Sequence, residues 1–247
     1  MDIAALYAAA AASDPARPFI TFYDDATGER TELSYLTFDN WVSKTANMLC
    51  GGFDCEPEDT AHIDLPTHWL TAAITVGTWR AGLTLTDAAD ADVAFHHESD
   101  AARLPKTPGT QRCLVSTLPL SIGLRDPEAK AAEQRAEAID FLSDVRGHGD
   151  DFMPITPVTQ ETSALQRPGG EDWTQASLIA AASARADELG ISAGQRSMFT
   201  DPEYTVAGMD WILVPLVTQG SVVVSMNSNA VDLKARAESE NAHLVTS

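Results

Sequence analysis

The sequence is short of positive charge and has no long apolar run. Among its 247 residues, 36 Asp and Glu face only 16 Lys and Arg, so the formal net charge is −20 and the pI is near 4.4. A field of this sign repels phosphate backbones and anionic bilayers, and we therefore expect neither a nucleic acid nor a membrane as partner. A free nucleotide can still bind where backbone N–H groups override that field locally.

Cysteine is scarce as well. Cys50, Cys55 and Cys113 are an odd number in a long chain, which argues against a disulfide framework, and only a turn through GGFD would let the first two pair. The N-terminal stretch MDIAALYAAAAASDP lacks the positive charge that precedes the apolar run of a secretory signal. No window holds eighteen strongly apolar residues. We expect reduced thiols and a cytoplasmic protein.

Apolar periodicity alternates between strand-like and helix-like segments along most of the chain. Short apolar runs predict strands at 19–23, 31–33, 61–65, 93–96, 113–116, 196–199, 221–225 and 243–245. Helical spacing predicts helices at 3–12, 35–49, 67–81, 128–146, 173–189, 204–218 and 232–240. This alternation predicts an α/β fold, with a mostly parallel sheet and helices on both faces. The unbroken Val222-Val223-Val224 run predicts a central strand.

One stretch interrupts the pattern. Residues 147–170 contain Pro154, Pro157 and Pro168 and have little periodicity, which is typical of a long connection. We therefore predict an N-terminal α/β subdomain over 1–150, a connecting loop over 151–170, and a second α/β segment over 171–247.

Four segments of the chain resemble known sequence motifs and follow one another in the same order as those motifs. They are ELSYLTF at 32–38, EDTAHIDLPTHWLTAAITVGTWRAG at 58–82, ASLIAAA at 176–182, and WILVPL with QGSVVV between 211 and 224. In this order they resemble the N-terminal part of the adenylate-forming (AMP-binding) superfamily, which includes the acyl-CoA synthetases. They are most similar to a truncated actinobacterial family of unknown function. The resemblance implies the α/β fold of that region, with ATP, AMP or CoA as the ligands to be considered.

The phosphate loop of that superfamily reads T-S-G-T-T-G-x-P-K-G, and the matching stretch here is TSALQRPGG at 162–170. Glycines in such a loop let backbone N–H groups approach phosphate, hydroxyls donate to its oxygens, and lysine adds charge. Here Ala, Leu and Gln fill the internal positions, and Gly169 stands at the lysine position. The resemblance implies no catalytic residue, and its cofactor-binding candidates are Thr162, Ser163, Arg167, Gly169 and Gly170.

Other polar clusters match no catalytic or metal motif. Neighbours within His96-His97-Glu98 point to opposite faces of a strand, so we expect no metal site there. His148 lies in a Gly-flanked turn, where a structural polar role competes with acid–base chemistry. We interpret the remaining groups as hydrated or structural: His62 and His68, Asp87, Asp90 and Asp92, and Asp150 and Asp151.

Three functions remain open at this point. The leading interpretation is a degenerate, non-catalytic AMP-binding-like protein that acts as a ligand-binding or protein-interaction module. The alternatives are acyl or aryl adenylation (CoA-ligase-type chemistry) completed by a partner chain, and a purely structural interaction protein. Full-length members of the superfamily continue with more sheet and a second domain. We therefore expect the C-terminal third, from Trp211 onward, to contact another copy or a protein partner.

Overall fold

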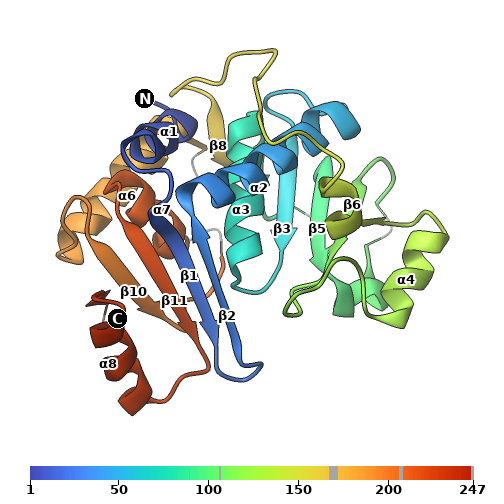
Figure 1. Ribbon diagram of the computed structural model, residues 1–247. Coiled ribbons are helices and arrows are strands. Elements are labelled where there is room, and N and C mark those ends of the chain that lie inside the picture. Colours follow the sequence, from blue (N-terminus) through green and yellow to red (C-terminus); the bar gives the residue numbers. More distant parts are fainter. Residues whose placement is uncertain (89, 106, 167–171, 206–207, 246–247) are drawn as a thin grey trace. The chain divides into compact units, whose positions relative to one another are not determined.

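The computed structural model contains two sheets, each accompanied by helices (Figure 1). It describes residues 1–88, 90–105, 107–166, 172–205 and 208–245. Tertiary contacts group these residues into two compact units, one formed by residues 1–39 with 175–247 and the other by residues 40–174. In the described part of the chain, no helix is long and apolar enough to span a bilayer.

The first unit is built on a five-stranded sheet with the order β12-β10-β11-β1-β2. β1 pairs in parallel with β11, β10 pairs in parallel with β11 and β12, and β2 is antiparallel to β1. The strands are β1 (Pro18–Asp24), β2 (Glu29–Ser34), β10 (Arg196–Thr200), β11 (Ser221–Met226) and β12 (His243–Leu244). The helices are α1 (Ile3–Ser13), α6 (Gln175–Glu188), α7 (Asp210–Val217) and α8 (Ala230–Ser239).

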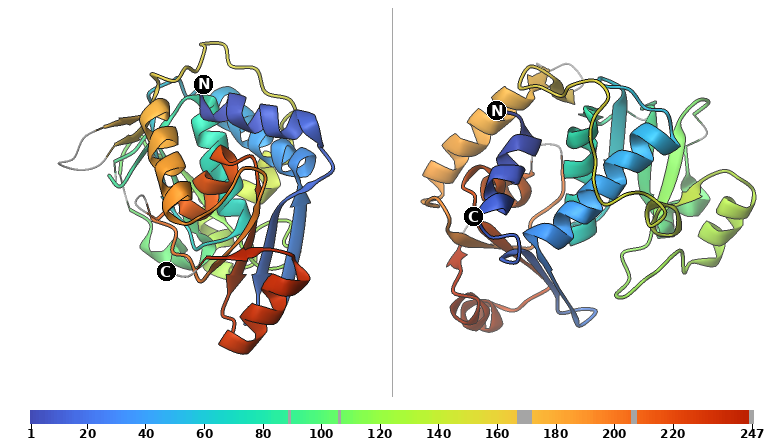
Figure 2. Two further views of the ribbon diagram at one scale, coloured as in Figure 1. Left: turned by 90° about the vertical axis from the view of Figure 1, so that its left-hand side faces the viewer. Right: turned by 45° about the horizontal axis from the view of Figure 1, so that its top comes forward.

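The valine run forms the middle strand of this sheet, as the sequence predicts. Val222, Val223 and Val224 are all fully buried in β11, between β10 and β1. Val223 packs on one face with Met198 and with α8, while its neighbours point to the opposite face because side chains alternate along a strand. α7 contacts β10 and β11 and also packs against α1 and α6 (Figure 2). Both faces of β11 are covered, which explains why its sequence is a continuous apolar run rather than an alternation of apolar and polar residues.

The second unit holds a seven-stranded sheet with the order β7-β6-β5-β3-β4-β8-β9, in which every pairing except β8–β9 is parallel. Its strands are β3 (Thr60–Asp64), β4 (Thr84–Thr86), β5 (Val93–His97), β6 (Gln111–Val115), β7 (Ile139–Asp140), β8 (Ser163–Gln166) and β9 (Trp173–Thr174). Its helices are α3 (Trp69–Ala81), α4 (Pro127–Gln134), α5 (Phe141–Val145), a π-helical turn (Met48–Gly52) and a 3₁₀ helix (Glu98–Arg103). α2 (Tyr35–Asn47) begins in the first unit and ends in the second.

The order of strands places a switch point in this second sheet. From β3 the chain passes through α3 to β4 on one side, whereas from β5 it passes to β6 on the other side. β3 and β5 are themselves neighbours. In open α/β sheets, ligands bind beyond the carboxyl ends of two strands whose connections diverge in this way. The carboxyl ends of β3 and β5 are therefore positions where functional side chains are expected.

Some boundaries differ from the sequence-based expectation. The helix predicted over 128–146 is two helices, α4 and α5, because Ala136 adopts a positive φ of 55° and β7 then pairs with β6. The helix predicted from 173 begins at Gln175, since Trp173 and Thr174 pair with β8. The compact units also differ from the division at 150 and 170, because β10, β11 and β12 return to the sheet that β1 starts.

Candidate functional site

The stretch that matches the phosphate loop begins as a strand. β8 pairs with β4 on one side and with β9 on the other. Ala164 and Leu165 are fully buried, and the Trp79 indole Nε1–H donates to the Ala164 carbonyl over 2.9 Å. This backbone is thus occupied by sheet and side-chain hydrogen bonds rather than open to a ligand.

The two hydroxyl candidates lie at the start of this strand. The Thr162 Oγ1 accepts a hydrogen bond from the backbone N–H of Thr159 over 2.9 Å, within a turn. Ser163 is the first residue of β8, where it pairs with Thr174, and its side chain is half-buried. The other three candidates, Arg167, Gly169 and Gly170, lie outside the described residues. Of the five predicted cofactor-binding residues, the structure therefore describes only Thr162 and Ser163.

The His96-His97-Glu98 sequence is split between different roles. His97 caps the 3₁₀ helix, and its ring nitrogens lie 2.8 Å from the Ser99 Oγ and 3.1 Å from the Thr117 Oγ1. Glu98 is buried, and its Oε2 accepts the backbone N–H groups of Arg125 and Asp126 over 2.6 and 2.8 Å. Both side chains thus position local backbone. No group of three or more His, Cys, Asp or Glu among the described residues is arranged to hold a metal ion.

The polar turn near 148 is fastened to α2. The Lys44 ammonium donates to the His148 carbonyl over 2.6 Å and forms an ion pair with Asp150 at 2.7 Å. The His148 Nε2 lies 3.2 Å from the Asp144 Oδ2, and the side chain of Asp151 is exposed. These contacts give the turn a structural role in holding residues 148–151 beside α2.

The other polar candidates also make local structural contacts. The His68 Nδ1 accepts the backbone N–H of Leu70 over 3.2 Å and so caps α3. The Asp92 carboxylate accepts the N–H and the hydroxyl of Thr60 over 2.8 and 2.7 Å, and these bonds hold the pKa of Asp92 below its usual value. Asp87 and Asp90 are exposed.

A grouping not predicted from the sequence lies at the switch point. In the register of β3 and β5, Asp64 stands opposite His96. The His96 Nδ1 is 3.6 Å from the Asp64 Oδ2, and the rings of His62 and His96 are 6.0 Å apart. With Asp100, Arg103, Leu104 and Pro105 they line a cavity of about 250 Å³. The only sequence signal was that both histidines fall near the ends of apolar strands.

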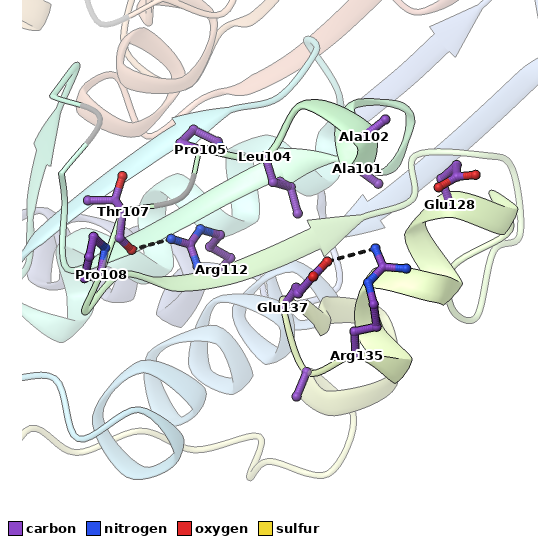
Figure 3. A pocket seen from close by; sticks show the side chains of 11 residues that line it. Ala101, Ala102, Leu104, Pro105, Thr107, Pro108, Arg112, Glu128, Arg135 and Glu137 are labelled. Carbon is purple, nitrogen blue, oxygen red and sulfur yellow. Dashed lines mark hydrogen bonds and ion pairs between the residues drawn. The ribbon is translucent and has the colours of Figure 1, made fainter.

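A larger cleft of about 660 Å³ shares Leu104 and Pro105 with this cavity (Figure 3). Its two guanidinium groups already have protein partners, since Arg112 donates to the Thr107 carbonyl and Arg135 pairs with Glu137 at 2.8 Å. These contacts balance the charge of the cleft internally. They give it no clear chemical preference for a ligand.

The three cysteines are free thiols. Cys55 and Cys113 are buried, and Cys50 is half-buried. Burial raises the pKa of Cys55 to about 12 and that of Cys113 well above its usual value. Because the thiolate is the reactive form, the raised pKa values of Cys55 and Cys113 argue against a nucleophilic role for these thiols.

Comparison with known proteins gives one close sequence relative and many structural ones. A TIGR03089 family protein of Mycobacterium tuberculosis is 32% identical over 234 residues, which cover 92% of this chain and 90% of that protein. No protein-family model matches the sequence.

Two solved structures illustrate the fold. The acyl-CoA synthetase of Brucella canis is similar at a TM-score of 0.74 and 14% identity, covering 99% of this chain and 47% of its own. The N-terminal domain of FACL13 from Mycobacterium tuberculosis is similar at a TM-score of 0.71 and 13% identity, covering 98% and 61%. The chain thus spans about half the length of the Brucella synthetase. These likenesses confirm the expected α/β fold, that of the N-terminal part of acyl-CoA synthetases.

Proposed function

This chain belongs to the TIGR03089 family, and from that premise we propose that it is a degenerate, non-catalytic AMP-binding-like protein. Its role is then to bind a ligand or a protein partner on a fold shared with acyl-CoA synthetases. The alternative, adenylation or CoA-ligase-type chemistry with a partner chain, requires a working phosphate site.

The connection from β8 to β9 is the observation that supports this proposal. Because Ser163–Gln166 is strand and Trp173 begins β9, only residues 167–172 remain for a phosphate loop. Their sequence, RPGGED, has no lysine and no hydroxyl, and its two carboxylates outnumber its one guanidinium. Adenylyl transfer depends on donors and positive charge placed around phosphate oxygens. A short connection with net negative charge supplies little of either.

An ATP–pyrophosphate exchange assay with a panel of acyl and aryl carboxylic acids tests the proposal. We expect no exchange above that of heat-denatured protein. Ser163→Ala is the informative variant, because Ser163 matches the serine of the superfamily's phosphate loop and begins β8, the strand that leads into the connection. Ser192→Ala is its control at an exposed serine. Exchange by the native chain that Ser163→Ala abolishes and Ser192→Ala preserves would establish the catalytic alternative instead.

A further inference from the structure

The cavity lined by His62, Asp64 and His96 occupies a distinctive place in the fold. It lies at the carboxyl ends of β3 and β5, and the 3₁₀ helix and the residues after it supply the rest of its lining. These two strands form the switch point of the second sheet, where their outgoing connections diverge. A cavity of about 250 Å³ is large enough for a molecule that displaces about eight waters, at about 30 Å³ each.

Two imidazoles and one carboxylate, those of His62, His96 and Asp64, line this cavity. His96 is 5% exposed and His62 is half-buried. Burial lowers the pKa of His96, and the nearby carboxylate of Asp64 only partly offsets this effect. Burial therefore favours the neutral form of His96. The His62 Nδ1 is 3.0 Å from the Thr86 carbonyl, which fixes its ring by a backbone contact.

Two residues of opposite charge, Asp100 and Arg103, also line the cavity. Within the described structure, neither the Asp100 carboxylate nor the Arg103 guanidinium makes a hydrogen bond or an ion pair. Both extend from the same 3₁₀ helix, and Asp100 is close enough to act on the charge of His96. The neighbouring cleft is different, because its Arg135 is paired with Glu137. A carboxylate and a guanidinium beside one cavity provide complementary sites for a positive and a negative ligand group.

We propose that this cavity binds a small zwitterion that carries an ammonium and a carboxylate, such as a short amino acid. Asp64 and Asp100 contact the ammonium, which has three donors, and the Arg103 fork contacts the carboxylate. The neutral imidazole of His96 accepts from the ammonium, while Leu104 and Pro105 cover the aliphatic part. The proposal gives a ligand class to the binding role proposed above and rests on that role.

Calorimetry and imidazole NMR signals of the full chain provide the test, with alanine, β-alanine, ethylamine and propionate as ligands at millimolar concentration. We expect alanine or β-alanine to bind saturably and to shift the His62 and His96 signals. Arg103→Gln and Asp100→Asn should each weaken that binding about tenfold or more. Arg135→Gln, which alters the neighbouring cleft, should leave binding unchanged.

Three outcomes would overturn the proposal. They are no shift of either histidine with any zwitterion, equally tight binding of ethylamine or propionate alone, and loss of binding in Arg135→Gln but not in Arg103→Gln. Arg103 is exposed and Asp100 half-buried, so their variants are expected to fold, and circular dichroism checks this. Pyrophosphate exchange is measured on the same samples. Exchange together with zwitterion binding contradicts the non-catalytic role alone, whereas absence of both contradicts the zwitterion site alone.

Discussion

Gly77 is a residue at which α3 has no room for a side chain. A Cβ at this position would lie 2.7 Å from the Thr45 Cβ and 3.0 Å from the Val42 carbonyl oxygen. Alanine is the better helix former by about 1 kcal/mol, but overpacking costs about 1–3 kcal/mol. We therefore predict that Gly77→Ala lowers the free energy of unfolding, as measured by urea denaturation.

Gly51→Ala is the matched control, because an added Cβ there meets nothing within 4 Å. We expect that variant to be as stable as the native chain or slightly more stable. Equal stability of the two variants would contradict the packing of α3 against α2 at this position.

His96 makes stability depend on pH. Burial lowers its folded-state pKa below the usual 6.5, so the unfolded chain binds more protons in the interval between the two values. The contribution of His96 to stability is complete above about pH 6.5 and is lost as pH falls through that interval toward the folded-state pKa. We predict that His96→Gln flattens the pH dependence of the urea midpoint between about pH 7 and 5.

The His96 ring signal gives a direct check, because its NMR titration should have a midpoint below 6.5. His243→Gln, in the other compact unit, serves as the control and should retain the native pH profile. A midpoint above 6.5 for His96 would reverse the sign of the effect.

At the scale of elements, α8 and the residue after it are tied to the first sheet by a charged network. Arg196 on β10 forms an ion pair with Glu240 at 2.6 Å, and their side chains are only 16% and 12% exposed. The Tyr23 hydroxyl also donates to Glu240. Although burial favours the neutral acid, the hydrogen bonds from Tyr23 and Arg196 hold the pKa of Glu240 below its usual value. The charged form is thus the stable one in the folded unit.

Removing the cation should be costly. We predict that Arg196→Met destabilises the chain by up to about 3 kcal/mol in urea denaturation, because it removes the nearer guanidinium from a largely buried carboxylate. Among the described residues, only Arg30, at 3.5 Å, then remains as a charge partner of Glu240. Arg135→Met, which breaks an exposed pair with Glu137, should have no measurable effect. The double variant Arg196→Met/Glu240→Leu should recover part of the loss. If Arg196→Met and Arg135→Met lowered the free energy of unfolding equally, burial would not be what makes the Arg196–Glu240 pair important for stability.

For the whole molecule, we expect the net charge of −20 to oppose self-association. The C-terminal third keeps its apolar residues inside: Trp211, Leu216 and Val223 are buried in α7 and β11. α8 has exposed side chains, and β12 is an edge strand of the described five-stranded sheet. Unpaired strand edges are sites at which chains pair.

We predict that sedimentation detects self-association that increases with salt, since a charge of −20 repels like copies until it is screened within about 8 Å at physiological ionic strength. Leu244→Lys on β12 should reduce it, whereas Lys234→Glu on α8 should leave it unchanged if the strand edge is the contact. A monomer at every salt concentration would contradict the expectation for this region.

Local chemistry made several elements predictable from the sequence alone. Asp126-Pro127 predicts a helix start, and the Asp126 Oδ1 does accept the N–H groups of Glu128 and Ala129. Gly82 predicts a helix end and has a φ of 89° after α3. The Val222–Val224 run predicts a buried central strand, and the α/β class follows from alternating periods. Each of these signals depends on residues close together in the chain.

Tertiary structure decided which distant segments share a site. Asp64 and His96 are brought together by the register of β3 and β5, and no local pattern encodes that register. The return of β10–β12 to the β1 sheet likewise depends on burial of β11 from both faces. Only the structure shows that Ser163–Gln166 is a strand, because the same residues also match a phosphate-loop motif in the sequence. Pairing between strands is non-local, so the sequence determined the elements, while packing decided their partners and the cavity between them.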